Sequence, residues 1–434
     1  MKRVWTCLAL AFGACLCLAA RAARFDGDAP AFDTDLSLTH PRWQGAASCS
    51  SAACHGSTDG KGVKGSESAI WIGHDAHGRA YNVLFNDRSQ RIARSLHLQQ
   101  PAHESNACLP CHASSPPPTQ RGERFQISDG VACESCHGPA EKWLAQHYLP
   151  GWKAKNDSEK QSLGFLPTKN LLQRAGACIR CHVGHDEVDV NHDLIAAGHP
   201  RLLFEYSSFL AAIPKHWSEE EERKRYPDLD ARAWMIGQVM TTQASLGLLA
   251  HRTRGIWPEL AEYDCRACHH DLTGQATSAG QRGEVGFLSW SDWQTALVPF
   301  ATSIQSGTNA EALTSSLAEI RAEMQKPAPS ADRVRNAVER GKEALRSMAD
   351  ALERGRSVEP TVLRKSFLEL RDDSIIARRS AESALQRHFG LRAFYKTLLD
   401  LQPKETVPRW RASFHSADLP AGFDKPIAKW LLQD

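Results

Sequence analysis

The chain has 434 residues, enough for two or three domains, and contains 13 cysteines and 19 histidines. Its formal net charge of +2 falls to −1 once residues 1–22 are removed, because that segment holds Lys2, Arg3 and Arg21 and no acidic residue. The slightly basic balance therefore gives no sign of nucleic-acid binding. Beyond residue 20 no apolar stretch is long enough to span a membrane.

The N-terminus has the pattern of a secretory signal peptide. A basic start precedes an uncharged apolar run over 4–20, and Ala20-Arg21-Ala22 fits an A-x-A cleavage site. A lipoprotein anchor at Cys15 is the weaker alternative, because the usual Leu is missing three residues before it. We therefore expect export to the periplasm, loss of residues 1–22, and a leader without periodicity over 23–45.

Residues 46–275 carry five motifs in which a second cysteine is followed at once by histidine. The second to fifth motifs have the spacing C-x-x-C-H, the attachment signature of c-type haem, in which the histidine is the proximal iron ligand. The first motif is stretched, so its extra residues must loop out. All cysteines after residue 17 belong to these motifs. The paired cysteines are Cys49 and Cys54, Cys108 and Cys111, Cys133 and Cys136, Cys178 and Cys181, and Cys265 and Cys268; the proximal histidines are His55, His112, His137, His182 and His269.

Zinc ribbons and disulfides are the alternatives for such cysteine pairs, but neither requires a histidine after each pair. The motifs therefore predict five covalently bound haems c, each with its iron. Because a ferric haem c adds about −1, the loaded chain would have a net charge of about −6.

The side of each iron opposite the proximal histidine decides its chemistry. A second histidine makes the iron six-coordinate and suited to electron transfer, whereas an open position leaves a place for substrate. His251 and His270 are weaker candidates for this second ligand. Met235 and Met240 could also ligate, but core packing explains them better. The other histidines that cluster in this region are His74, His77, His147, His185, His192, His199 and His216.

Two segments resemble the cytochrome c-554 family of multihaem electron carriers. Cys133-Glu-Ser-Cys-His-Gly-Pro139, with His147 ten residues beyond the motif histidine, is similar to a family segment whose downstream histidine is a distal ligand. The run from Trp71 through Asp75-Ala76-His77-Gly-Arg-Ala80 resembles a second one. The resemblance implies that His77 and His147 are distal ligands. His192, His199 and His216 are candidates for the remaining positions, with a hydrogen bond to a haem propionate as the alternative for each.

The resemblance covers about residues 46–275. Segments 189–202, 214–217 and 265–272 resemble larger bacterial multihaem relatives with an extended core. The small family carrier has four haems and this chain has five motifs, so we expect an extended pentahaem relative.

The last third of the chain changes in character. Residues 276–288 are rich in Gly and Ser and predict a linker, and residues 289–434 predict a helical domain of three to five helices. Ser330 is a good N-cap for a helix that Gly355 ends. Its apolar stripe is Val334, Val338, Gly341, Leu345, Met348 and Leu352. Similar patterns cover 363–370 and 375–401, and a further amphipathic helix is expected over 230–252.

The predicted fold is therefore mainly α: a multihaem cytochrome c domain of short helices and long loops around clustered haems, plus a C-terminal helical bundle. The favoured function is a periplasmic electron carrier that exchanges electrons with periplasmic or membrane-bound redox proteins, with no residue assigned a catalytic role. One alternative is an oxidoreductase acting on nitric oxide, hydroxylamine or nitrite at one five-coordinate haem, with Asp193, Arg201 and Glu205 as acid-base candidates that propionate pairing explains better. Another is a docking subunit that uses the C-terminal helices.

Overall fold

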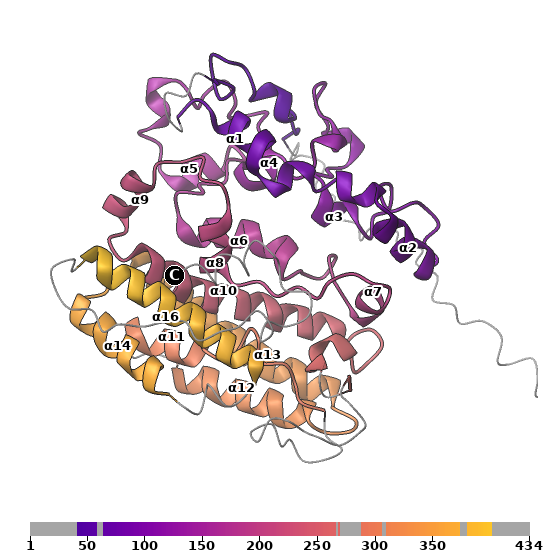
Figure 1. Cartoon of the computed structure of the whole chain (residues 1–434), viewed down its shortest axis with the longest axis vertical. Coiled ribbons are helices and arrows are strands. Elements are labelled where there is room, and N and C mark those ends of the chain that lie inside the picture. The colour runs from indigo at the N-terminus through magenta and orange to yellow at the C-terminus, as the bar shows by residue number, and fades with distance from the viewer. Residues whose placement is uncertain are drawn as a thin grey trace, which may run out of the picture. The chain divides into compact units, whose positions relative to one another are not determined.

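The computed structural model describes residues 41–58, 64–265, 268–269, 288–305, 310–373 and 380–401, which fold mainly as helices (Figure 1). In these residues there is no sheet, and three isolated bridges are the only β-type pairings. The predicted fold class, mainly helical with short elements first and long helices last, is confirmed. The predicted signal peptide, most of the leader and most of the linker lie outside the described residues.

The cysteine-rich part consists of short helices joined by long connections. Polar side chains cap several of them: Asn170, for example, accepts hydrogen bonds from the backbone N–H groups of Leu172 and Gln173 at the start of α6. The helices are α1 (Glu67–His74), α2 (Asp87–Ser95), α3 (Leu109–His112), α4 (Cys133–His137), α5 (Asp157–Gln161), α6 (Leu171–His182), α7 (His192–Ala196), α8 (Tyr206–Ala212) and α9 (Glu219–Arg225).

The side chains of the first cysteine motifs contribute little apolar core of their own. A single small cluster of buried residues lies between residues 84 and 113, made of Leu84, Ala93, Ala102, Leu109 and Ala113. Such a cluster is small for a segment of this length, which fits the predicted domain of short helices and long loops around clustered haems.

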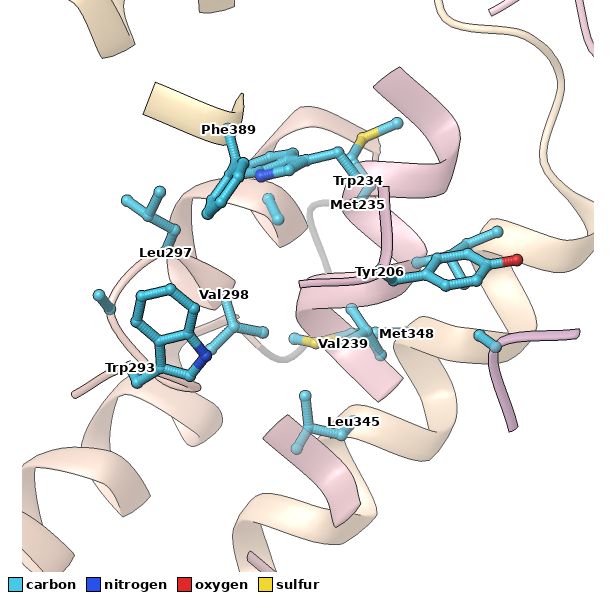
Figure 2. Close-up of a cluster of buried hydrophobic side chains, with 14 of the residues drawn as sticks. Tyr206, Trp234, Met235, Val239, Trp293, Leu297, Val298, Leu345, Met348 and Phe389 are labelled. Atoms are coloured by element: carbon cyan, nitrogen blue, oxygen red, sulfur yellow. The ribbon is translucent and has the colours of Figure 1, made fainter. Parts of the chain in front are cut away.

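The helix α10 (Leu229–Arg252) lies at the centre of the large hydrophobic core. Sixteen of its 24 residues are buried, so it is enclosed on nearly all sides and is not the one-sided amphipathic helix expected from sequence. The reason is that α6 and α8 pack on it together with α13 (Ala331–Arg354) and α16 (Ala381–Leu401). Figure 2 shows this core, where Trp234 and Val239 of α10 lie among Tyr206, Trp293 and Phe389.

The C-terminal helices follow the predicted pattern closely. The Ser330 hydroxyl caps α13 by accepting the Arg333 N–H at 3.4 Å, and Gly355 follows its last residue. Every member of the predicted apolar stripe is buried. The pattern predicted over 375–401 is helical from residue 381, as α16, and residues 375–379 lie outside the described residues. The helices are α11 (Val298–Gln305), α12 (Ala310–Met324), α13 (Ala331–Arg354), α14 (Pro360–Asp372) and α16 (Ala381–Leu401).

The hydrophobic core around α10 contains residues from both predicted domains, 46–275 and 289–434. This helix belongs to the segment assigned to the haem domain, yet it packs against α13 and α16 from the C-terminal segment. Both methionine candidates lie in this core or against it, Met235 fully buried and Met240 partly buried, as expected for packing residues. Among the described helices, none is both long and apolar enough to cross a membrane.

Candidate haem-attachment sites

The cysteine motifs lie on single helical turns. The third motif is α4 itself, the second is α3 with Cys108 as its N-cap, and the fourth forms the last turn of α6. At the fifth motif the His269 N–H likewise bonds to the Cys265 carbonyl oxygen at 2.8 Å, while residues 266–267 lie outside the described residues. Because residues three apart share one face of a helical turn, both thiols of a motif point to the same side. None of the ten motif cysteines, all of which the structure describes, forms a disulfide.

The stretched first motif folds differently. Its inserted residues form a tight turn in which the Cys54 N–H bonds to the Ser51 carbonyl oxygen at 2.9 Å, and the Gly56 N–H bonds to the same oxygen at 3.0 Å. The turn shortens the path between the two cysteines and His55. This is the looping out that the sequence required.

Four motif histidines each face a second histidine from a distant part of the chain. The ring centroids are 6.0 to 6.5 Å apart in every pair. An iron bound to both Nε2 atoms at about 2 Å would hold two imidazole centroids about 6 Å apart, so the spacing fits one iron per pair. The pairs are His55 with His147, His112 with His199, His137 with His216, and His182 with His77.

The other ring nitrogen of these histidines is held by the protein. Seven of the eight Nδ1 atoms lie within hydrogen-bond distance of an oxygen. Metal-bound histidines almost always use their second ring nitrogen in this way, which fixes the ring and directs Nε2 toward the metal. The partners are Glu67 for His55, Asp75 for His77, the Ala80 carbonyl for His112, Thr168 for His137, the Leu144 carbonyl for His147, the Pro200 carbonyl for His199 and the Pro214 carbonyl for His216.

Burial favours the neutral form of most paired histidines, which is the form that binds a metal. It lowers the pKa of His137 and of His182 to about 4. Burial also lowers the pKa values of His112, His199 and His216. At His77 the effect of burial is outweighed by the hydrogen bond and charge of Asp75, which raise its pKa.

The motifs adjoin one another in an order that differs from the chain order. A hydrogen bond from the Cys133 thiol lowers the pKa of the Cys49 thiol, so the third motif touches the first. The fourth motif contacts the third, since the guanidinium of Arg180 donates to the Ser135 carbonyl oxygen at 2.9 Å. It also contacts the second motif, with Cys181 Sγ 3.5 Å from the Pro110 carbonyl oxygen. The spatial order is therefore first, third, fourth, second.

The fifth motif lies beside an ion pair from two other segments. Arg201 Nη1 is 3.7 Å from Cys265 Sγ and 2.7 Å from the Glu382 carboxylate of α16. The backbone N–H of His192 bonds at 2.8 Å to Glu259, whose carboxylate caps the turn leading to Cys265. In the part of the chain that the structure describes, no ring pair involves His269 or His192. The structure thus brings His77, His147, His199 and His216 opposite motif histidines, but not His192.

The acid-base candidates have other contacts. Glu205 is buried and caps α8 by accepting from the N–H groups of Ser207 and Ser208. Asp193 is exposed in the first turn of α7. Glu67, Ala80 and Thr168 were not predicted as ring partners, and neither was Asp75. Only Asp75, two residues before His77 in the family-like segment, could have been found from the sequence.

Comparison with known protein families gives one match. Residues 48–138 match the family described as Cytochrome c554 and c-prime, and this segment contains the first three motifs. The match confirms the predicted resemblance over these residues; the resemblance predicted for the rest of 46–275 stays a prediction. No curated protein matches the chain, and neither does any solved structure.

Proposed function

We propose that this chain, a multihaem c-type cytochrome whose residues 48–138 form a cytochrome c554 and c-prime domain, carries five covalent haems c and transfers electrons in the periplasm. When bound, haem supplies a one-electron ferric–ferrous couple. The protein contributes thiols for attachment, histidines for ligation and the contacts that orient them. Its partners in this proposal are periplasmic or membrane-bound redox proteins, and residues 1–22 serve as the export signal.

The observation that carries the proposal is the set of four facing histidine pairs. We assign the distal ligands by these pairs: His147 for the first motif, His199 for the second, His216 for the third and His77 for the fourth. Two rigidly held imidazoles keep an iron six-coordinate in both oxidation states, so little has to rearrange when an electron arrives. The contiguous order of the motifs supports the same function, because adjoining sites suit rapid electron exchange.

The fifth site is the place for the alternative function. An oxidoreductase acting on a small nitrogen compound needs one iron with an open side, and at the four pairs two imidazoles would hold the iron from both sides. Only the motif at Cys265 and His269 remains for such chemistry, with Arg201 beside it. His192, whose backbone N–H bonds to Glu259 ahead of this motif, remains the distal candidate there, and its ligation would close the side that the alternative function needs open.

Mass spectrometry and spin-state measurements on the purified full-length protein test the proposal. We expect five added haem masses of about 616 Da each on a chain that starts near Ala23. At least four irons should be low-spin in the ferric protein. Four haems would show that the stretched first motif is not used, and a majority of high-spin irons would refute the carrier.

A further inference from the structure

The ring partners of the paired histidines fall into two chemical classes. His77 and His55 bond through Nδ1 to carboxylates, Asp75 at 2.8 Å and Glu67 at 2.9 Å. At the second and third motifs no carboxylate accepts from a ring: the acceptors there are backbone carbonyls and, for His137, the Thr168 hydroxyl. The charges of Asp75 and Glu67 do act on His216 of the third motif, but without a hydrogen bond. The four sites thus divide into two with a hydrogen-bonded carboxylate and two without.

Asp75 is built into its place. Its side chain is buried, and Oδ1 accepts both the backbone N–H of His77 at 3.0 Å and the ring Nδ1–H at 2.8 Å. Glu67 is held in a similar way, since Oε2 accepts the Gly65 N–H at 2.9 Å besides the His55 ring. The His55–Glu67 pair is more exposed, with 40% of the His55 side chain and 24% of the Glu67 side chain accessible. Solvent therefore weakens the second contact more than the first.

A carboxylate acts differently from a carbonyl on a metal-bound imidazole. A hydrogen bond to an ionised acceptor is roughly twice as strong as one to a neutral group. It draws the Nδ1 proton toward the oxygen and makes Nε2 a stronger electron donor, which tunes the metal. A stronger donor and a nearby negative charge both stabilise ferric iron over ferrous iron, so they lower the reduction potential.

We propose that Asp75 and Glu67 are positioning residues that hold the haems of the fourth and first motifs at lower potential than those of the second and third. This inference rests on the proposed function. The fourth motif, with its buried carboxylate, has the lowest potential of the four. It adjoins the second motif, whose two histidines bond only to carbonyls. The largest downhill step for an electron therefore lies between these neighbouring sites, directed toward the second motif.

Potentiometric titration of the holoprotein and three isosteric variants tests the inference. Asp75→Asn keeps an acceptor for His77 but removes the charge. We expect the reduction potential of one haem to rise by about 59 mV, which is a tenfold loss of preference for the ferric state. Glu67→Gln should raise a different component by a smaller amount. Asp129→Asn is the matched control, because it removes a half-buried carboxylate that accepts the Ala46 N–H and touches no histidine ring in the described residues.

Haem mass and spin state, measured on the same samples, distinguish failure of this inference from failure of the proposed electron-carrier function. If every variant keeps its low-spin haems and no component moves, or if Asp129→Asn moves one as far as Asp75→Asn does, the inference is wrong and the carrier stands. If the wild-type protein lacks low-spin haems, the proposed function itself fails. Should Asp75→Asn not accumulate, Glu67→Gln decides alone: a rise supports the inference and no rise overturns it.

Discussion

Replacing His199 by Ala removes one imidazole from one pair and leaves every thioether site intact. His199 faces His112 with ring centroids 6.4 Å apart, and its Nδ1 bonds to the Pro200 carbonyl oxygen at 2.7 Å. Alanine offers no ligand, so a single iron should lose its sixth ligand. With five haems expected, one-fifth of the ferric iron should change from low-spin to high-spin or water-ligated.

The pairs make the effect of combined variants predictable. His77 belongs to a different pair, so His77→Ala with His199→Ala should convert two-fifths of the iron, the sum of the single effects. His74→Ala is the matched control, since His74 is exposed at the end of α1. It should convert none.

The assay is low-temperature electron paramagnetic resonance of the ferric protein, with haem content checked by mass. Each variant should keep the wild-type haem number. A wild-type spectrum from His199→Ala at full haem content would show that the facing rings do not mark a ligation site, and the pairing argument would fail with it.

Three further predictions concern the part of the chain around the C-terminal helices. Arg201→Met leaves the buried Glu382 carboxylate without its cation and should lower the free energy of unfolding by about 3–5 kcal/mol in urea titrations. Adding Glu382→Met should restore most of this free energy. If the two substitutions instead lower it additively, the ion pair does not stabilise the fold as argued. Gly341→Ala should destabilise by about 1–3 kcal/mol although alanine favours helices, because its Cβ would lie 2.7 Å from a Ser316 hydroxyl that is held by the Ala337 carbonyl oxygen; unchanged thermal unfolding would contradict this. Burial lowers the pKa of His388 to about 4, so the folded state resists protonation of this ring. The free energy of unfolding should therefore fall by up to about 3 kcal/mol as the pH drops from about 6.5 to 4. His388→Gln should reduce this pH dependence in urea titrations followed by circular dichroism.

The sequence was most informative where chemistry needs a fixed local spacing. The C-x-x-C-H motifs, found by their spacing, lie on the turns at α3, α4 and the end of α6, and the apolar stripe of α13 predicted its buried face. Both depend on residues a few positions apart, whose geometry one helical turn determines.

Partners far apart in the chain were not predictable in this way. The distal candidates were identified as a group, but nothing in the sequence said that His147 faces the first motif or that His77 faces the fourth. Those pairs depend on how the long loops return. The central position of α10 was missed for the same reason, since a helix packed on several sides loses the one-sided pattern by which sequence recognises it.

The ring planes of the four pairs provide the most direct test of the account. His55 and His147 are nearly parallel, at 17°, whereas the other pairs cross at 77° to 88°. Two parallel imidazoles donate to the same one of the two iron dπ orbitals, so the energies of these orbitals differ. Two perpendicular imidazoles donate to one orbital each, so the two energies stay nearly equal. Electron paramagnetic resonance of the ferric wild-type protein should therefore show three highly anisotropic low-spin signals and one rhombic low-spin signal from these sites. High-spin iron at more than the single fifth site would contradict the claim that the facing histidines ligate haem.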